Sequence, residues 1–525
     1  MLLKIYPRSL RKIFTNRVSE LDYLEYLKKE LIADRPFNLA IMGLRRTGKS
    51  VLIKEFMLRN EKDKEVEMVY MNIQLMTTNV YDFAIRYLGS VNYWVSARNR
   101  NYMDYLTKSA LLTKSPEIGE LKDHLRKVYD ELEKSRPNKA YILDLTFSYP
   151  QLLSRSTNKK LIIFLDEFQD IIALNKQKDV GNILNIFRDQ FTRDDTAYVL
   201  AGSLTSVIED IISNSKSPLF AQAEKMYLKF FTPAGTKELT DKLLRIENPR
   251  IHDMIYKYSS GHPFYVHHIL KRMRMLHELQ NLDINEHLAK EAFIIETLSK
   301  EGKIYDLCNY IYRISLERGR YYTALKSILN ILAKEEALNQ SQIARKLRIS
   351  QGASKEYLNE LMELDLVIVD EHKYYFRDPV FKYWIGYTQL GMEVDELPRK
   401  KDLFLLIREL DEKFQRASSE LGKAKEYEFK AKLEDKFKIK LRNYLSKDGQ
   451  IEFDLIGEKN NTTYIFEIKW RNKPATYKDL EKFLEKIKSS EFSKKSKKLF
   501  FISKAGFTEK AQSLAKENHI LLRKQ

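Results

Sequence analysis

Four residues near the start of the chain have the types and the spacing to bind a nucleotide phosphate. Gly43, Gly48, Lys49 and Ser50 fit the pattern G-x-x-x-x-G-K-[ST]. Backbone N–H groups in such a loop surround an anion, which large side chains would block. The lysine is then placed for the β- and γ-phosphates, and the serine hydroxyl for Mg²⁺. We therefore predict that ATP and Mg²⁺ bind at a loop made of Gly43, Leu44, Arg45, Arg46, Thr47, Gly48, Lys49 and Ser50.

A pair of acidic residues follows an apolar run further along the chain. Residues 161–165 are all apolar, as expected of a parallel strand covered on both faces, and Asp166 and Glu167 come next. The carboxyl end of such a strand is where a nucleotide-binding sheet presents its ligands. We expect Asp166 to hold Mg²⁺ together with Ser50, and Glu167 to polarise the attacking water. The alternative is a strand end with two solvated carboxylates.

Two further candidate sites lie at boundaries between elements. Ser203 ends the apolar run 197–202 and could sense the γ-phosphate, or it could cap the helix that follows. His262 and Pro263 lie in a Gly-His-Pro turn, where the proline suits the first turn of the next helix. We interpret His262 as a structural or nucleotide-adjacent side chain rather than as a metal ligand.

A second constellation, near the C-terminal end, combines two acids and a lysine. Residues 451–456 and 463–470 alternate as two neighbouring strands. Side chains two apart in a strand share a face, so Glu467 and Lys469 point together, and Asp454 can join them from the neighbouring strand. Carboxylates suit Mg²⁺, which lowers the pKa of a bound water, while the lysine can orient the nucleophile. The alternative is a hairpin whose charges alternate by chance.

The elements that hold the first site alternate between strands and helices. Apolar runs predict strands at residues 37–42, 66–72, 161–165 and 197–202. Helical patterns follow the phosphate loop and cover 182–191, so we expect a three-layer α/β arrangement around a parallel sheet. Asn16 could cap the first helix, and Arg17 could reach the nucleotide base or pair with an acid. Residues 76–150 are mostly helical.

Residues 321–384 form a different pattern. They predict helices at 324–333, 339–347 and 355–363, followed by a hairpin about His372 and Lys373. Helix, turn, helix and a two-stranded wing make a winged helix-turn-helix. The helix after the turn would enter a major groove of DNA with residues near its start, Ser350, Gln351, Ser354 and Lys355. The alternative is a winged helix that packs on the rest of the chain and contacts no DNA.

Composition narrows the classes of protein. The only cysteine, Cys308, excludes a disulfide scaffold and a cysteine-cluster zinc site, and fits a reducing cytosol. There is no apolar run of 18 residues, so we expect a cytoplasmic protein with no membrane partner. Residues 401–525 hold 30 Lys/Arg and 20 Asp/Glu, a net +10 of the +18 carried by the chain. This charge fits binding to a DNA backbone, or a lysine-rich solvated surface.

The motifs of the first 300 residues together resemble the archaeal ATPase family, in the STAND branch of AAA-type P-loop NTPases. The matching segments are FTNR at 14–17 with Glu20 and Leu21, the loop GLRRTGKS, LDEF at 165–168, AGS at 201–203 and GHP at 261–263. The resemblance implies ATP binding, slow hydrolysis and a nucleotide-controlled switch. One departure is that Pro218-Leu219-Phe220 is followed by Ala221 and Gln222, where members often carry an arginine. Its absence would remove charge stabilisation from the transition state.

The C-terminal constellation resembles the PD-(D/E)XK restriction-endonuclease fold. Asp454, Glu467 and Lys469 fit its motif, and residues 498–503 with a helix from Thr508 supply the further strand and helix. Glu428, on a helix predicted at 426–437, could complete the site, with Glu426 as its rival. The resemblance implies that Asp454 and Glu467 bind Mg²⁺, and that Glu428, Asp454, Glu467 and Lys469 are catalytic.

The expected architecture is α/β: a three-layer P-loop NTPase at 1–235, a helical lid at 236–310, a winged helix at 311–388, a linker at 389–415 and a restriction-endonuclease-like domain at 416–525. The favoured function is an ATP-dependent switch coupled to a Mg²⁺-dependent DNA nuclease. The alternatives are an ATP-switched DNA-binding regulator that does not cleave, and a ring-forming remodelling ATPase. A homo-oligomer or a protein partner stays possible on sequence grounds.

Overall fold

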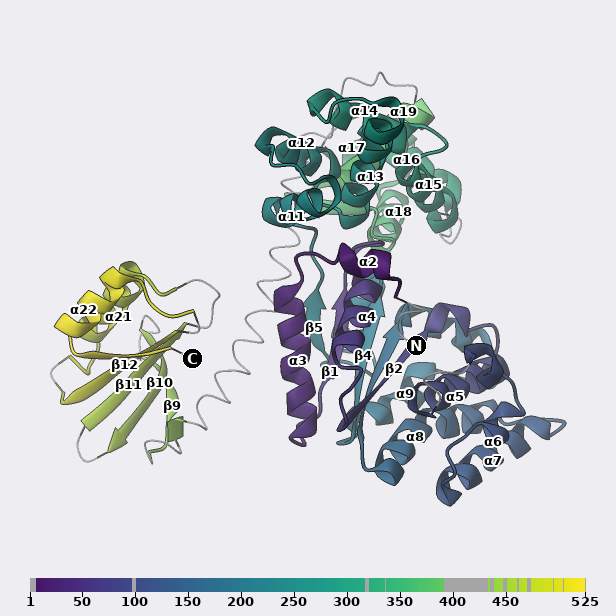
Figure 1. Cartoon of the computed structure of the whole chain (residues 1–525), viewed down its shortest axis with the longest axis horizontal. Coiled ribbons are helices and arrows are strands. Elements are labelled where there is room, and N and C mark those ends of the chain that lie inside the picture. The colour runs from purple at the N-terminus through teal and green to yellow at the C-terminus, as the bar shows by residue number, and fades with distance from the viewer. Residues whose placement is uncertain are drawn as a thin grey trace. The chain divides into compact units, whose positions relative to one another are not determined.

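The computed structural model describes residues 6–96, 101–316, 321–335, 337–390, 433–434, 439–446, 451–459, 462–469, 474–493, 495–503 and 505–524. The chain divides into two compact units, Met1–Lys413 and Phe414–Gln525, called here the N-terminal and C-terminal units (Figure 1). In the described parts of both units, no helix has the length and apolar character needed to cross a membrane.

A five-stranded parallel sheet forms the centre of the N-terminal unit. Its strands are β1 (Asn38–Met42), β2 (Val66–Asn72), β3 (Lys160–Asp166), β4 (Thr196–Gly202) and β5 (Glu224–Tyr227). They lie in the order β2-β3-β4-β1-β5, and every neighbouring pair is parallel. The apolar runs of β3 and β4 are buried almost throughout, as expected of strands covered on both faces. The predicted α/β class and parallel sheet are confirmed.

Helices connect these strands and cover the sheet (Figure 1). They are α2 (Arg8–Lys12), α3 (Val18–Ile32), α4 (Lys49–Arg59), η1 (Ile73–Leu75), α5 (Val80–Ser96), η2 (Tyr102–Tyr105), α6 (Ala110–Thr113), α7 (Gly119–Glu133), α8 (Lys139–Thr157), η3 (Phe168–Lys176), α9 (Ile183–Arg188), η4 (Asp189–Thr192) and α10 (Thr205–Ser213). Helix α4 contacts β4, α5 contacts β2, and α8 contacts β3 and β4.

The predicted cap at Asn16 is wrong. Helix α3 begins at Val18, so its N-cap residue is Arg17, and no side chain caps it. Asn16 instead has a left-handed backbone with φ 53°. Its side chain lies against Gly235, where an added Cβ would come within 2.3 Å of Asn16 Nδ2. Tertiary packing therefore takes Asn16 out of the capping position.

A helical lid follows the sheet. Its helices are α11 (Pro233–Leu244), α12 (Pro249–Ser259), α13 (Pro263–Gln280), α14 (Glu286–Leu298) and α15 (Lys303–Tyr310), followed by the π-helical turn η5 (Ile311–Ser315). Each of α11, α12 and α13 starts with a proline, preceded by a polar residue whose side chain accepts a backbone N–H. Proline has no N–H to leave unpaired in the first turn, which is why these three helices begin where they do.

The winged helix comprises α16 (Tyr322–Lys334), β6 (Leu338–Asn339), α17 (Gln340–Leu347), α18 (Gln351–Glu363), β7 (Val367–Asp370), β8 (Lys373–Phe376) and α19 (Pro379–Leu390). Its antiparallel strands lie in the order β6-β8-β7. The helix after the turn was predicted to start at Lys355, and this start is wrong. Ser350 accepts the N–H of Ala353 and caps the helix, so that α18 begins at Gln351.

The C-terminal unit is built on a mixed five-stranded sheet. Its elements are β9 (Arg442–Leu445), β10 (Glu452–Lys459), β11 (Thr462–Lys469), α21 (Tyr477–Ser489), β12 (Lys497–Ser503), α22 (Glu509–Glu517) and β13 (Ile520–Lys524). The order is β13-β12-β11-β10-β9; β9, β10 and β11 pair antiparallel, whereas β11, β12 and β13 pair parallel. Strand β10 extends to Lys459, three residues beyond the strand predicted at 451–456. Of the helix predicted at 426–437, only residues 433–434 are described, and they are helical.

Replacement of Gly261 by alanine should destabilise the lid. Gly261 has φ +72°, and an added Cβ would lie 2.2 Å from the carbonyl oxygen of Phe231. The left-handed backbone alone costs an L-residue about 1–2 kcal/mol, and the clash adds to this. We expect Gly261→Ala to lower the thermal unfolding midpoint of the full chain clearly.

The matched control is Gly352→Ala. Gly352 lies in α18, and the nearest atom to an added Cβ is 3.9 Å away. Alanine in a helix is favoured over glycine by roughly 0.5–1 kcal/mol, so the midpoint should stay or rise. Equal midpoints for the two variants would contradict the account of Gly261.

Candidate functional site

The loop between β1 and α4 has the backbone of an anion-binding loop. Gly48 has φ 99°, and an added Cβ on Gly43 would lie 2.9 Å from the carbonyl oxygen of Leu228. Lys49 Nζ donates to the carbonyl oxygens of Gly43 and Leu44 at 2.7 and 2.9 Å. Burial lowers the pKa of Lys49 to about 8, although Glu167 and Asp166 oppose this shift. The loop thus leaves no room for a larger side chain at Gly43, and it encloses the amine of Lys49. Both features fit a phosphate ligand.

The carboxyl edge of the sheet brings Ser50 and Asp166 together, as predicted. Ser50 Oγ donates to Asp166 Oδ2 at 2.5 Å, and the Tyr70 hydroxyl donates to the same oxygen at 2.7 Å. A hydroxyl and a buried carboxylate are hard oxygen donors of the kind that Mg²⁺ prefers, so this pair fits the metal. Tyr70 was missed in the sequence. The only indication in the sequence is that Tyr70 lies on the predicted strand 66–72. In the structure it pairs with Phe164 of β3.

Glu167 lies beside Ser203. Glu167 Oε2 accepts Ser203 Oγ at 2.8 Å, Ser203 N at 3.3 Å and Gln169 Nε2 at 2.5 Å. Burial would raise the pKa of Glu167, but the Gln169 hydrogen bond and the charge of Lys49 outweigh it and lower the pKa. The capping alternative for Ser203 is wrong, because Leu204 is the N-cap residue of α10 and the Ser203 hydroxyl donates to Glu167. Gln169 was not among the predicted residues.

The lid contacts the phosphate loop through His262 and two arginines. His262 Nε2 lies 3.0 Å from the carbonyl oxygen of Arg45, and His262 Nδ1 accepts the N–H of Phe264 at 3.3 Å. The Arg45 and Arg46 guanidinium groups lie over the rings of Tyr310 and Phe264, at 5.4 and 5.3 Å from the centroids. Burial lowers the pKa of His262 to about 3. The ring is therefore neutral, with Nε2 protonated to donate to Arg45.

Pro263, directly after His262, is the first residue of α13. Arg17, whose role the sequence left open, pairs with Glu20 at 3.0 Å. Its second terminal nitrogen donates to the carbonyl oxygens of Thr47 and Lys229, at 3.2 and 2.6 Å. Arg17 thus connects α3 to the back of the phosphate loop.

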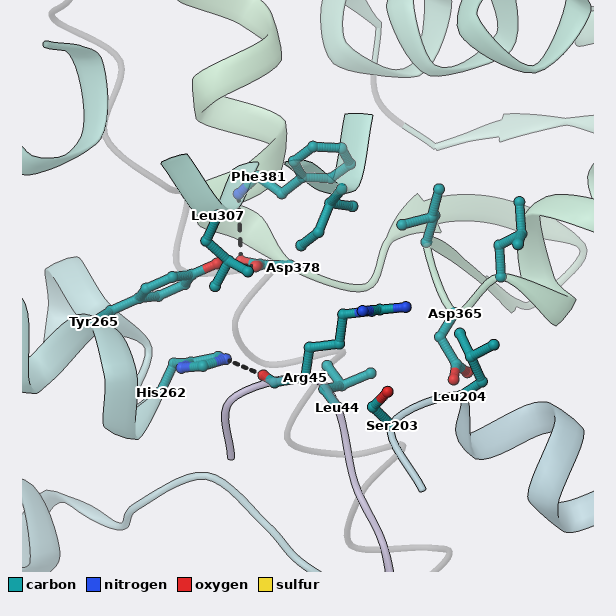
Figure 2. A pocket seen from close by; sticks show the side chains of 13 residues that line it. Leu44, Arg45, Ser203, Leu204, His262, Tyr265, Leu307, Asp365, Asp378 and Phe381 are labelled. Atoms are coloured by element: carbon teal, nitrogen blue, oxygen red, sulfur yellow. Dashed lines mark hydrogen bonds between the residues drawn. The ribbon is translucent and has the colours of Figure 1, made fainter. Parts of the chain in front are cut away.

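A small cavity, about 40 Å³ in volume, lies where the loop, the end of the sheet, the lid and the winged helix meet (Figure 2). It has room for about one water molecule. The residues that line it come from all four parts and include Leu44, Arg45, Ser203, His262, Tyr265, Asp365 and Asp378. The four parts are therefore in close contact directly beside Ser203.

One buried carboxylate joins the winged helix to the carboxyl edge of the parallel sheet, a contact called here the Asp365 junction. Asp365 Oδ1 accepts the hydroxyls of Thr205 and Ser206, each at 2.7 Å. Its carboxylate also accepts the backbone N–H groups of both residues. Arg377 pairs with Asp365 and donates to Thr205 Oγ1 at 2.9 Å. These donors form the N-terminal end of α10, two residues after Ser203, and no motif predicted them.

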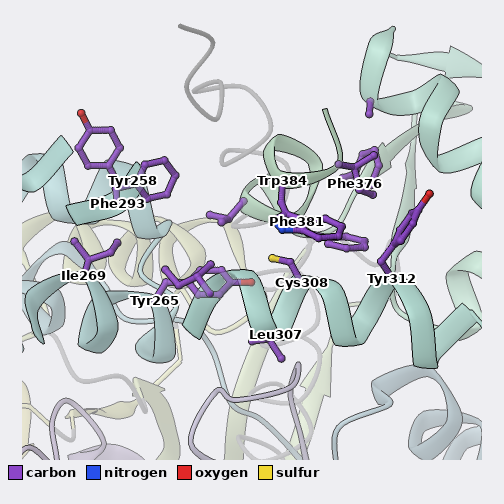
Figure 3. Close-up of a cluster of buried hydrophobic side chains, with 14 of the residues drawn as sticks. Tyr258, Tyr265, Ile269, Phe293, Leu307, Cys308, Tyr312, Phe376, Phe381 and Trp384 are labelled. Atoms are coloured by element: carbon purple, nitrogen blue, oxygen red, sulfur yellow. The ribbon is translucent and has the colours of Figure 1, made fainter. Parts of the chain in front are cut away.

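The lid and the winged helix share one hydrophobic core (Figure 3). Tyr258 of α12 and Phe293 of α14 stack with ring centroids 4.9 Å apart. Trp384 of α19 is fully buried, with the rings of Tyr305 and Tyr312 at 5.5 and 5.7 Å. A displacement of the winged helix from the sheet therefore has to involve the lid that contacts the phosphate loop.

The start of α18, which the sequence predicts to enter a groove of DNA, is largely exposed. Ser350, Gln351 and Lys355 are exposed, whereas Ser354 is fully buried, so the prediction that Ser354 faces DNA is wrong. Its side chain faces α17, where its hydroxyl lies 3.5 Å from the carbonyl oxygen of Gln340. Exposed basic and imidazole side chains around the turn and wing are Arg345, Lys346, Arg348, His372 and Lys373.

In the C-terminal unit the structure brings Glu467 and Lys469 together, with Lys469 Nζ 2.7 Å from Glu467 Oε1. Asp454 Oδ2 accepts the N–H of Ile468 at 2.6 Å. Burial opposes the charge of Lys469, but Glu467 outweighs it and raises the pKa of Lys469. Lys486 of α21, which no motif predicted, also contacts Glu467, at 3.1 Å.

The donor set for a metal in this unit is small. Glu428 and its rival Glu426 lie outside the described residues. Among the residues that are described, no group of three or more His, Cys, Asp or Glu side chains could hold a metal ion. Asp454 and Glu467 therefore supply two hard oxygen ligands, which fit Mg²⁺ only with water or further ligands.

The fold and the phosphate loop define a P-loop ATPase domain followed by a winged helix. Residues 14–269 match the family described as an ATPase domain predominantly from Archaea. Residues 324–368 match the winged helix-turn-helix DNA-binding family. Neither match extends into the C-terminal unit. Among curated protein sequences, none matches the chain.

Two solved structures are similar to this chain. The Walker-type ATPase PABY2304 of Pyrococcus abyssi is similar at 16% identity and a TM-score of 0.51, over 73% of this chain and 99% of that one. The ORC2 protein of Aeropyrum pernix, in its ADPNP and ADP complexes, is similar at 15% identity and a TM-score of 0.44, over 76% and 95%. The P. abyssi structure supports the P-loop ATPase fold.

His262 should make the stability of the N-terminal unit depend on pH. Its pKa of about 3 in the folded protein lies below the value of 6.5 for a free histidine, so the unfolded chain binds more protons below pH 6.5. Stability from this group is present above pH 6.5 and is lost as the pH falls toward 3, by about 1 kcal/mol per pH unit. His262→Gln should flatten the pH dependence of the unfolding midpoint between pH 6.5 and 4.

The control for this experiment is His277→Gln, which changes an exposed histidine of the same helix. It should leave the slope as in the unchanged protein. A slope that His262→Gln does not alter would contradict the assignment of a neutral His262.

Proposed function

We propose that this protein is an ATP-controlled switch that acts on DNA. The observation that carries the proposal is the Asp365 junction, because it joins the winged helix to the helix that starts two residues after Ser203. Ser203 in turn donates to Glu167 at the candidate ATP site. The candidate nucleotide site is thus connected to the winged helix by hydrogen bonds on either side and by the short backbone step from Ser203 to Thr205.

In this proposal the phosphate loop and Lys49 bind the phosphates of ATP, and Ser50 and Asp166 hold Mg²⁺. The metal would neutralise charge on the phosphates when it is bound. Glu167 would orient the attacking water, but its Oε2 oxygen already accepts Ser203 and Gln169. Together with the missing arginine at Ala221 and Gln222, this favours slow hydrolysis and a long-lived ATP state.

Charge supplies a reason for the switch. Asp365 lies near enough to Lys49 for its carboxylate to influence the pKa of the Lys49 amine. A γ-phosphate at the loop would place further negative charge close to this buried carboxylate, and like charges repel strongly where water is excluded. ATP binding would therefore weaken the Asp365 junction and release the winged helix together with the lid.

The released domain would bind DNA through the N-terminal turn of α18. Gln351 and Lys355 are exposed there, and Arg345 and Arg348 lie on the adjoining α17 and the turn after it. Such a helix enters the major groove with its first residues, while nearby basic side chains contact phosphates.

Weakening of the Asp365 junction should raise DNA affinity in the absence of ATP. Ser206→Ala removes the hydroxyl that donates to Asp365 and, at 3.0 Å, to the carbonyl oxygen of Met362, yet keeps Asp365 paired with Arg377. We expect DNA binding without nucleotide, measured by fluorescence anisotropy, to tighten about threefold or more, because the lost bond contributes on the order of 1 kcal/mol.

Ser215→Ala is the matched control, since Ser215 is exposed just after α10 and loses the same neutral hydroxyl without touching the junction. It should leave the nucleotide dependence intact. If Ser206→Ala binds DNA with the same ATP dependence as the unchanged protein, the switch does not run through this contact.

For the C-terminal unit we propose a Mg²⁺-dependent DNA nuclease. Asp454 and Glu467 would be the metal ligands, Lys469 would orient the nucleophile, and Glu428 would complete the site. The pairing of Glu467 with Lys469 on β11, beside Asp454 of β10, supports this. So does the net charge of +10 over residues 401–525, which suits a phosphate backbone.

The second candidate is a regulator that binds DNA without cleaving it. It is favoured by the small donor set among the described residues, where no group of three metal-binding side chains occurs. In that case the lysine-rich C-terminal unit would bind DNA without cleaving it, and its affinity for DNA would fall steeply as the salt concentration rises.

Point substitutions should separate the two sites. We expect Lys49→Ala to abolish ATP binding, because it removes the buried amine of the loop. We expect Asp454→Ala or Lys469→Ala to abolish Mg²⁺-dependent cleavage of linear or branched DNA while sparing ATP binding. Nucleotide binding is measured with a fluorescent ATP analogue, and cleavage on gels with and without ATP.

Glu458→Ala, an exposed position on β10, is the control and should cleave normally. If the unchanged protein with Mg²⁺ and ATP leaves every DNA intact but binds it in a salt-dependent way, the nuclease proposal fails and the regulator is favoured.

A further inference from the structure

Glu467 of the C-terminal unit has an unusual set of partners. Its side chain is only 4% exposed, yet two lysines contact it: Lys469 of β11 at 2.7 Å and Lys486 of α21 at 3.1 Å. Lys486 also lies 3.3 Å from the other carboxylate oxygen, so it contacts both. The carboxylate of Asp454, which accepts the N–H of Ile468, is a second negative group near Lys469, so the two lysines balance the charge that a divalent cation would balance.

The position of Lys486 is determined by packing. Helix α21 is anchored by Leu480, Phe483 and Ile487, which are buried in the core that also contains Phe453 of β10. Lys486 is adjacent to this apolar stripe, so its stem runs along the edge of the helix and its amine reaches the sheet at Glu467. Because the anchor is rigid, the contact is a feature of the fold rather than of a loose surface side chain.

We propose that Lys486 is a second lysine of the candidate nuclease site, which takes the place of a divalent cation at Glu467 and contacts a DNA phosphate once a metal is bound. This rests on the function proposed for the C-terminal unit. A divalent cation at Glu467 adds two positive charges beside two ammonium groups, and like charges repel. The group that can leave is Lys486, because Lys469 is held on a central strand of the sheet.

The exposure of the Lys486 side chain indicates where its displaced amine would go. The Lys486 side chain is 37% exposed, so it borders solvent, whereas Glu467 is buried beneath it. A phosphodiester that reaches the metal must approach from that open side. A lysine on a flexible four-carbon stem is a compact charge suited to a phosphate oxygen there. The same residue then opposes metal binding in the absence of DNA and favours DNA binding when the metal is present.

These two roles predict opposite effects of a single substitution. Loss of Lys486 should tighten metal binding and weaken DNA binding. A purely structural ion pair would behave differently, because its loss would destabilise the unit and leave metal affinity unchanged or lowered. The sign of the change in metal affinity thus discriminates between them.

The test uses Lys486→Met in the full-length protein without nucleotide, with Mn²⁺ as the probe and electron paramagnetic resonance as the readout. We expect the Mn²⁺ dissociation constant of the site lost in Asp454→Ala to fall about threefold or more, because a competing positive charge is gone. DNA affinity in Ca²⁺, measured by anisotropy, should weaken. Lys486→Arg keeps the charge and should stay near the unchanged protein in both measurements.

Lys482→Met is the matched control, since Lys482 is exposed one turn earlier on the same helix. It should leave Mn²⁺ affinity unchanged and reduce DNA affinity less than Lys486→Met does. Equal Mn²⁺ affinity in the two methionine variants, both folded by thermal unfolding, would overturn the proposal for Lys486. A protein that cleaves no DNA while Lys486→Met still binds Mn²⁺ more tightly would overturn only the nuclease function.

Discussion

The Asp365 carboxylate, buried against the first turn of α10, is the interaction on which the arrangement of the N-terminal unit depends. It accepts hydrogen bonds from Thr205 and Ser206 and is neutralised by Arg377. Both charged groups are desolvated, so separating them is costly unless each regains water or another partner. A contact of this kind is either fully made or fully lost. That property makes it suited to carry a two-state change between the nucleotide edge and the winged helix.

The sheet and the shared core determine what such a change would involve. Parallel strands end at one edge, so the loop after β1, Asp166 of β3 and Ser203 after β4 all meet there. His262 of the lid contacts the loop, while Trp384 of the winged helix lies in the same core as the lid. The lid and the winged helix are therefore packed together, and the lid contacts the phosphate loop. The C-terminal unit also contains a buried carboxylate, Glu467, which two lysines contact.

Much of the fold could be predicted because its signals are local. The runs of β1 to β4 are short, apolar and bounded by turns, and α11, α12 and α13 start at prolines. The phosphate loop is a contiguous pattern, so Lys49 and Ser50 could be placed in it from the sequence. Asp166 could be placed beside Ser50 because parallel strands present their carboxyl ends on one side. These inferences needed only periodicity, spacing and the general behaviour of α/β sheets.

Other features depended on contacts between distant segments. Asn16 has the type of a cap, but packing against Gly235 decided its conformation, and Ser203 turned to Glu167 rather than to α10. Asp365 and Lys486 belong to no sequence motif and could not be predicted. Each has a specific role only because the fold brings its partners next to it. The sequence by itself determined the order of strands and helices and the phosphate loop, since these follow from neighbouring residues. Tertiary structure alone decided which buried charges meet, because that choice is made by side chains far apart in the chain and by the burial that strengthens their attraction.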